Sequence, residues 1–162
     1  MFKLVESLII LGKGSVCGKT SLSIKTKQDI PGYDGEIVWT VASHSISDAD
    51  GYLALHNEDL GDRPEIKESW VHYSLCVPCS KGILINNSIS ALIMYGAGIF
   101  KKIRIAGCPM AIRTEYEEQR ESLFMAMGYA KSLGVEVTWD NDNADYVNYY
   151  TKALAVTEYI KK

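Results

Sequence analysis

Two short motifs hold the residues whose types and spacing could do chemistry. His56 and Glu58 form an H-x-E, and Cys76 and Cys79 form a C-x-x-C. One imidazole and two thiolates make three protein ligands, the number that a catalytic zinc has when its fourth position is kept for water. The glutamate two residues after the histidine is then available to carry protons beside that water. Taken alone, the C-x-x-C is equally typical of a structural zinc site or a redox pair.

Together and in this order, the motifs resemble the zinc-dependent cytidine and deoxycytidylate deaminases, in which H-x-E is followed downstream by P-C-x-x-C. In this chain Leu75 stands where that pattern has the proline. The resemblance implies one Zn²⁺ bound by His56, Cys76 and Cys79. It also implies that Glu58 is the catalytic residue, as the proton carrier of a hydrolytic deamination.

A weaker likeness to the same family lies upstream. Ser15-x-Cys17-x-Lys19-x-x-Leu22 is similar to the S-x-C-x-R-x-x-V that leads into the first strand of deoxycytidylate deaminases, with lysine in place of arginine. It implies that Lys19 lies near a substrate phosphate. The other substrate contacts that we expect are Asn57, Ser74 and His44. A polar residue at a strand end such as His44, or its neighbour Ser43, is also compatible with simple solvation.

The reaction that the resemblance implies is the hydrolysis of dCMP, or of a C5-modified form of it, to the corresponding dUMP. A cytidine or deoxycytidine nucleoside deaminase is an alternative from the same family. A zinc-stabilised interaction module without catalysis is the alternative from another class. Lys13, Lys19, Arg113 and Arg120 are the cations that could meet a substrate phosphate, although each is also typical of an ordinary surface charge.

The segment Gly18-Lys19-Thr20 invites comparison with a nucleotide-triphosphate loop. The motif needs a glycine five residues before Gly18, and that position is Lys13. We also expect no strand before it, because Phe2, Val5, Leu8 and Ile9 recur at helical spacing. The sequence therefore argues against a phosphate loop of this kind.

The composition of the chain restricts the kinds of partner that the protein can bind. The 162 residues form a single domain, 1–162, with 47% hydrophobic residues, 23% charged residues and a net charge of -3. A pI near 5.6 favours a small-molecule pyrimidine nucleotide over a nucleic acid as the partner. Four cysteines, two of them in a C-x-x-C, fit a reducing compartment, and no apolar run is long enough for a membrane span. We expect a cytoplasmic homo-oligomer.

The spacing of the hydrophobic residues, together with the residues that end helices or form turns, predicts an α/β fold. We expect a three-layer α/β/α sandwich around a mixed five-stranded sheet whose later strands are parallel, as in the cytidine deaminase fold. The first helix ends at Gly12 and Gly14. A hairpin follows, with strands around Leu22–Ile24 and 36–47, and a short helix then starts near His56. The later elements are a strand over 69–74, a helix over 78–95, a strand over 99–106, a helix from Thr114 to Gly134, a strand over 135–139 and a final helix that contains Tyr146 to Leu154.

Overall fold

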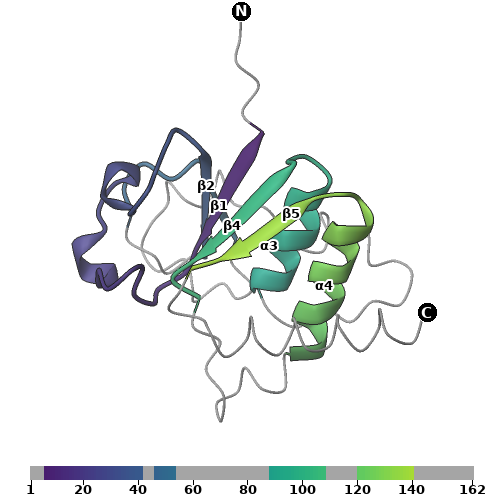
Figure 1. The fold of residues 1–162 in the computed structure, drawn as a ribbon. Helices are drawn as coiled ribbons and strands as arrows, with labels where there is room; N and C mark the ends of the chain where they lie inside the picture. Colours follow the sequence, from purple (N-terminus) through teal and green to yellow (C-terminus); the bar gives the residue numbers. More distant parts are fainter. Residues whose placement is uncertain (1–5, 42–45, 54–87, 109–119, 141–162) are drawn as a thin grey trace, which may run out of the picture.

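The computed structural model describes residues 6–41, 46–53, 88–108 and 120–140 (Figure 1). Five strands form one sheet in the order β3-β2-β1-β4-β5, and all four pairings are parallel. The predicted α/β class is confirmed. The elements in chain order are β1 (Ser7–Leu11), the 3₁₀ turns η1 (Ser21–Ser23) and η2 (Lys27–Asp29), β2 (Ile37–Val41), β3 (Gly51–Leu53), α3 (Ser88–Ala97), β4 (Lys102–Ala106), α4 (Arg120–Ser132) and β5 (Glu136–Trp139).

Strand β1 is the centre of the sheet, between β2 and β4. Its residues from Leu8 to Leu11 are all fully buried, because helices or loops cover both faces of a central parallel strand. The predicted helix over this segment is therefore wrong. A short, continuous apolar run fits the buried face of a helix and a strand buried on both faces equally well, so its spacing alone could not separate the two.

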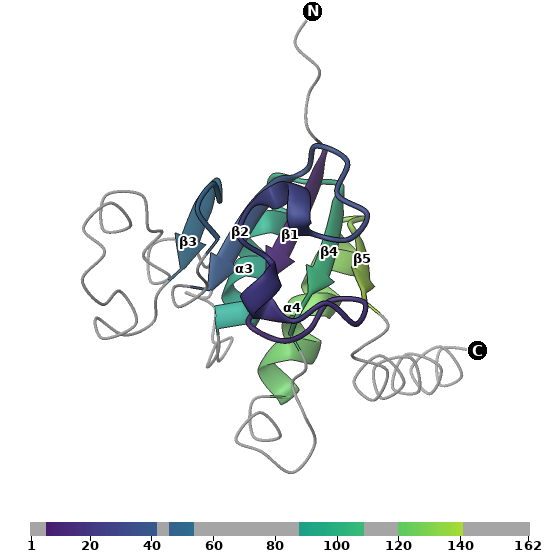
Figure 2. The same cartoon turned by 90° about the vertical axis from the view of Figure 1, so that its left-hand side faces the viewer.

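The two faces of the sheet carry different covers, as Figure 2 shows. Leu8 and Ile10 point to the face on which α3 and α4 pack. Ile9 and Leu11 point to the opposite face, where residues 12–36, here called the crossover segment, lie over β1 and β2. The described cover of this second face is irregular rather than helical. The three-layer arrangement therefore stays a prediction, and the predicted mixed sheet is not found among the described strands.

The ends of helices α3 and α4 agree with the sequence signals, whereas their predicted starts at 78 and at Thr114 lie outside the described residues. α3 ends at Ala97, directly before Gly98, and β4 and β5 lie inside the predicted strands. α4 ends in a Schellman motif, with the amide of Gly134 bonded to the carbonyl of Lys131 and that of Val135 to Ala130. Gly134 has φ +74, which suits glycine. The glycines that end the two helices were thus sufficient to predict the order of elements from α3 to β5. None of the described helices has the length and apolarity to cross a membrane.

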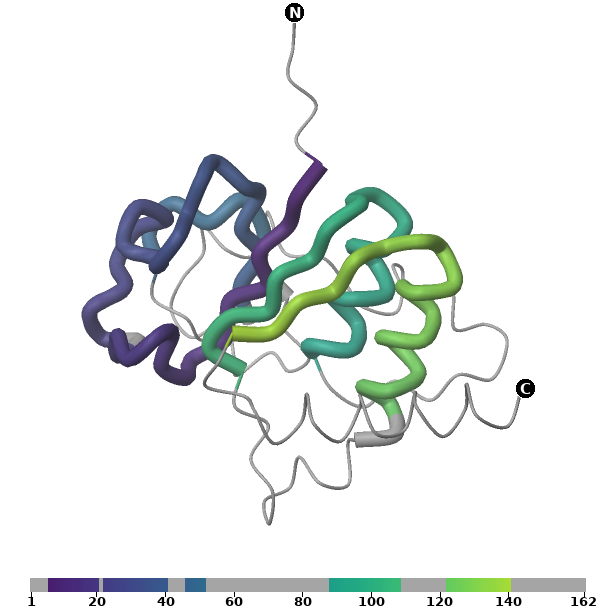
Figure 3. Tube along the Cα trace, in the orientation of Figure 1, coloured from purple at the N-terminus to yellow at the C-terminus, as the bar shows by residue number. Residues whose placement is uncertain are grey.

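The crossover segment replaces the predicted hairpin, which is wrong. β2 pairs with β1 in parallel, and Leu22 lies in η1 with 77% of its surface exposed, so its alternation with Ile24 did not mark a half-buried strand. Polar contacts hold the segment instead. The carboxylate of Asp29 accepts hydrogen bonds of 2.9 Å from the amides of Lys25 and Thr26, and these bonds lower the pKa of Asp29. Figure 3 shows this part of the chain as a compact unit beside the strands.

Candidate functional site

The carboxyl ends of the strands meet at one edge of the sheet, here called the carboxyl edge, because every pairing is parallel. At this edge the connection after β1 and the connection after β4 turn to opposite faces of the sheet. The crossover segment after β1 covers one face of the sheet, and α4, which precedes β5, covers the other. This divergence makes the junction between β1 and β4 the topological switch point of the sheet, where open α/β sheets bind their ligands.

Backbone packed against backbone closes the end of this junction. The amide of Gly12 donates to the carbonyl of Ala106 at 2.8 Å, and the amide of Gly14 donates to that of Gly107 at 2.6 Å. A Cβ atom at Gly12 would overlap the Gly107 carbonyl and lie 2.6 Å from Sγ of Cys108. Gly107 itself has φ +66, and a Cβ atom there would lie 2.9 Å from the carbonyl oxygens of Gly12 and Gly14. We call these three glycines the glycine clasp.

The segment after the clasp turns back on itself. Val16 and Lys19 exchange backbone hydrogen bonds of 2.8 and 2.9 Å around Cys17 and Gly18, which have φ values of 49° and 78°. Two successive positive φ values are those of a type I′ turn. A strand does precede the Gly18-Lys19-Thr20 segment, which corrects our expectation, but within the described crossover segment a tight turn and 3₁₀ turns take the place of the α-helix of a phosphate loop. The spacing argument against such a loop is unchanged.

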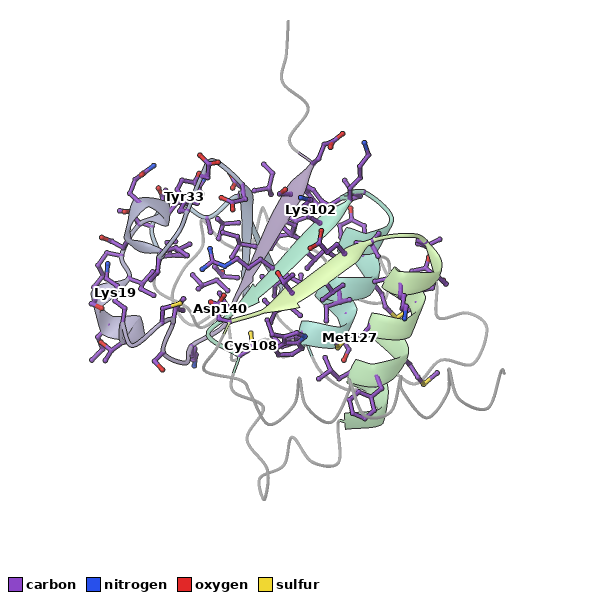
Figure 4. The ribbon with its side chains drawn as sticks, in the orientation of Figure 1. Lys19, Tyr33, Lys102, Cys108, Met127 and Asp140 are labelled. Carbon is purple, nitrogen blue, oxygen red and sulfur yellow. The ribbon has the colours of Figure 1, made fainter. Side chains whose placement is uncertain are left out.

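Cys108 lies against the clasp and has a packing role. Its side chain is buried, and Sγ lies 3.5 Å from the carbonyl oxygen of Ala106. Burial raises the pKa of the Cys108 thiol to about 12. The thiol therefore stays protonated near neutral pH, which makes it a poor nucleophile and a poor metal ligand. In Figure 4 Cys108 and Asp140 lie close to each other near the ends of the strands, and Lys19 lies in the crossover segment.

Arg104 and Asp140 form an ion pair that joins three segments. Nε of Arg104, on β4, lies 3.0 Å from Oδ1 of Asp140, directly after β5, and the side chains are 21% and 8% exposed. The guanidinium also donates to the carbonyl of Pro31 in the crossover segment. In the sequence Arg104 belongs to the short basic run Lys101-Lys102-Ile103-Arg104, for which we expect a place at the ends or the edge of the strand. Its position within the strand, on the face of the crossover segment, explains why it is half-buried and paired instead.

Replacing Arg104 by methionine should lower the free energy of unfolding by about 3 kcal/mol, because the nearly buried carboxylate of Asp140 would lose its partner. Urea unfolding followed by circular dichroism would measure the loss. Lys102→Met is the matched control on the same strand. Its ammonium lies 3.9 Å from Glu136 in an exposed pair, so we expect a loss below about 1 kcal/mol. Equal losses in the two variants would contradict the role of the Arg104 pair.

Of the predicted substrate-binding residues, the structure describes Lys19. Its ammonium donates to the carbonyl oxygen of Asp29 at 2.8 Å and lies 3.8 Å from the carboxylate of the same residue. A phosphate at Lys19 would have to compete with these contacts. Lys13, between Gly12 and Gly14 of the clasp, has an exposed side chain, and Arg120 is the first residue of α4. The remaining predicted residues lie outside the described residues: His44, His56, Asn57, Glu58, Ser74, Cys76, Cys79, Arg113 and the neighbouring Ser43.

The chain reaches residues 54–87 from the carboxyl edge and returns from them at the same edge. β3 ends there at Leu53, and α3 begins there at Ser88, since it runs back across the sheet to the start of β4. Between residues 6 and 140, leaving aside 42–45, 54–87 and 109–119, no cluster of three or more His, Cys, Asp or Glu side chains could hold a metal ion. The zinc site stays a prediction.

Comparison of the chain with protein-family models, with curated proteins and with solved structures finds no significant match. The functional interpretation therefore rests on the residues and on the arrangement of the sheet.

Proposed function

We propose that the protein binds a small nucleotide at the carboxyl edge of its sheet, over the junction between β1 and β4. The observation that carries this proposal is the strand order β3-β2-β1-β4-β5 with every pairing parallel. That order is shared with the first five strands of the doubly wound sheets that bind nucleotides. The support comes from the arrangement of the fold, and the ligand itself is inferred from chemistry.

The charge of the protein and the residues of the clasp favour a free nucleotide. A net charge of -3 offers little general attraction for a nucleic-acid backbone. Lys13 lies between two clasp glycines and has an exposed side chain, so it is available for a phosphate group, whereas Lys19 already contacts Asp29. We therefore infer that the ligand is a pyrimidine nucleotide whose phosphate lies near Lys13. We rank dCMP first because of the upstream likeness to deoxycytidylate deaminases.

We propose zinc-dependent hydrolytic deamination of that nucleotide as the reaction, with the three-layer arrangement that the resemblance implies. One observation favours it: β3 ends at Leu53 at the carboxyl edge, and His56 follows Leu53 by three positions in the sequence. The donor set of His56, Cys76 and Cys79 suits zinc, and a bound zinc would supply an acidified water. Glu58 would take a proton from this water and deliver it to N3 of cytosine and then to the leaving amino group.

In this reaction a C–O bond forms at C4 of cytosine, the C4–N bond breaks and ammonia leaves. The nucleoside deaminases remain the alternative substrate class, and the zinc-stabilised interaction module remains the non-catalytic alternative. In that module the same three ligands would contribute only to folding stability.

One panel tests both the binding and the reaction. dCMP, deoxycytidine, cytidine and cytosine are titrated by calorimetry, and loss of cytosine absorbance is followed in parallel. We expect dCMP to bind most tightly, and Lys13→Gln to weaken dCMP by about tenfold while leaving deoxycytidine unchanged, since one charge contact to phosphate is lost. Lys25→Gln, which changes another exposed lysine of the crossover segment, is the control.

Each outcome of the panel has a separate meaning. Binding of none of the four compounds would reject the proposed ligand class. Binding without loss of absorbance would reject deamination and leave nucleotide binding in place. Preference for the unphosphorylated nucleosides would move the function to a cytidine deaminase and would exclude the role of Lys13.

A further inference from the structure

Strand β5 is one of the two outer strands of the described sheet, and its only neighbour there is β4 (Figures 1 and 2). The amides of Glu136 and Asp140 donate to backbone carbonyls on the β4 side at 3.0 and 3.1 Å. Along a parallel strand, successive residues direct their backbone groups to opposite sides. Val137 and Trp139 therefore direct their N–H and C=O groups away from the sheet, and no hydrogen bond to these groups is found among the described residues.

The outer side of β5 carries few of the features that keep a strand edge unpaired. Proteins protect such an edge with lysine, proline or a bulge, because it can otherwise pair with another chain. β5 has the sequence Glu-Val-Thr-Trp, with neither lysine nor proline, and its register with β4 advances one residue at a time. The backbone of β5 is therefore suited to accept a further strand.

The chain itself is not expected to supply that strand. Residues 141–162 lie outside the described residues, and the spacing from Tyr146 to Leu154 predicts a helix there. The predicted strand over 69–74, which also lies outside the described residues, falls between β3 and α3 in the chain, and β3 forms the opposite edge of the sheet.

The side chains of β5 are complementary to those of a second, antiparallel β5 when Thr138 lies opposite Thr138. Val137 of each copy then lies opposite Trp139 of the other, and these residues exchange their outward N–H and C=O groups. Pairs of an aromatic with a β-branched residue, and pairs of threonines, are favourable across strands. Val137 and Trp139 pack against the core on the helix face, whereas Thr138 is exposed on the other face.

The charges also permit this register. Glu136 of one copy would lie opposite Asp140 of the other, and two carboxylates in such a position repel each other. Each carboxylate already has a cation on β4 of its own copy. Glu136 lies 3.9 Å from the ammonium of Lys102, and Asp140 lies 3.0 Å from Nε of Arg104. The paired edge would therefore hold no uncompensated charge.

We propose that β5 pairs antiparallel with β5 of a second copy of the chain, about a twofold axis at Thr138, so that the two sheets of the dimer become one. The inference is independent of the proposed nucleotide and zinc sites. The carboxyl edges of the two copies lie at opposite ends of the joined sheet, and both candidate sites stay open. Because β5 is four residues long, the paired edge is short, and we expect a weak dimer with a dissociation constant in the micromolar range.

Sedimentation at increasing protein concentration measures the dimer, and a charge exchange at Thr138 tests the axis. Thr138→Lys places two ammonium groups opposite each other, so it should weaken the dimer by about fivefold or more. Thr138→Glu should do the same with two carboxylates. An equimolar mixture of the two variants should dimerise at least as tightly as the wild type, since opposite charges then meet. Thr20→Lys, at an exposed threonine of the crossover segment, is the control and should keep the wild-type dimer.

Amide hydrogen exchange locates the interface independently of any substitution. Exchange at Val137 and Trp139 should become slower as the wild-type concentration rises, whereas exchange at Gly98, in the turn before β4, should not change. Circular dichroism should show the same thermal transition for dilute wild-type and Thr138→Lys protein, because Thr138 is exposed. A wild type that stays monomeric, an unweakened Thr138→Lys dimer or a monomeric mixture would each overturn the inference. Protection of the two β5 amides at every concentration would also overturn it, since the same chain would then cover the edge.

Discussion

Replacing Gly12 by alanine should prevent the protein from reaching its stable folded state. The added methyl group would overlap the carbonyl of Gly107 and press on Sγ of Cys108, which is itself buried. The backbone has little room to move, because the Gly12 amide is bonded to Ala106. We expect a loss of about 4 kcal/mol or more, which is a large part of the stability of an ordinary domain. Soluble yield and the thermal transition in circular dichroism would measure it.

Gly128→Ala provides the control for the Gly12 variant. Gly128 lies on the exposed side of α4, and a Cβ atom there would meet nothing within 4 Å. Alanine is favoured over glycine within a helix, so this variant should gain about 0.5–1 kcal/mol. A Gly12→Ala protein that melts at the wild-type temperature would show that the clasp has another conformation in solution.

Replacing Glu58 by glutamine should lower the turnover of dCMP by about 10²- to 10⁴-fold if the proposed deamination is correct. The amide keeps the shape of the side chain but cannot carry the proton, while the zinc ligands are unchanged. Turnover would be followed by cytosine absorbance, and zinc by elemental analysis of the same samples. We expect one zinc per chain in both the wild-type and the variant protein.

The control for Glu58 is Glu136→Gln, which removes an exposed carboxylate from the first residue of β5, at the edge opposite the clasp. This variant should retain both turnover and zinc. Full activity in Glu58→Gln would exclude the proposed role of this residue. Absence of zinc from the wild-type protein would exclude the metal site altogether, and zinc without any turnover would favour the interaction module.

The second half of the described fold could be predicted from the sequence, because local signals fix it. Gly98 and Gly134 mark where the helices end, and the residues after each glycine enter a strand. The first half could not be predicted in this way. The run from Leu8 to Leu11 becomes a strand because β2 and β4 pair with it, and these partners are distant in the sequence. A preference that depends on distant pairing leaves no local periodicity.

The candidate site was predicted only in part for a related reason. Gly12 and Gly14 were interpreted as the end of a helix, whereas their role depends on the contact with Gly107. Arg104 was expected at the ends or the edge of its strand, and its partner Asp140 is 36 residues away. The sequence gives the residue types, but these contacts arise only when the strands are in register. The zinc and deamination hypothesis concerns residues outside those that the structure describes, so it stays a prediction.

The central position of β1 has a consequence for synthesis on the ribosome. Its register with β4 pairs residues about 95 positions apart, since Ser7 lies opposite Lys102. At roughly 5–20 residues per second, the apolar strand is complete about 5–20 s before this partner has been made. During that interval one edge of the strand is open to pairing with another nascent chain. The protein should therefore depend on chaperones during translation more than a protein of the same size in which every strand pairs with its neighbour in the sequence.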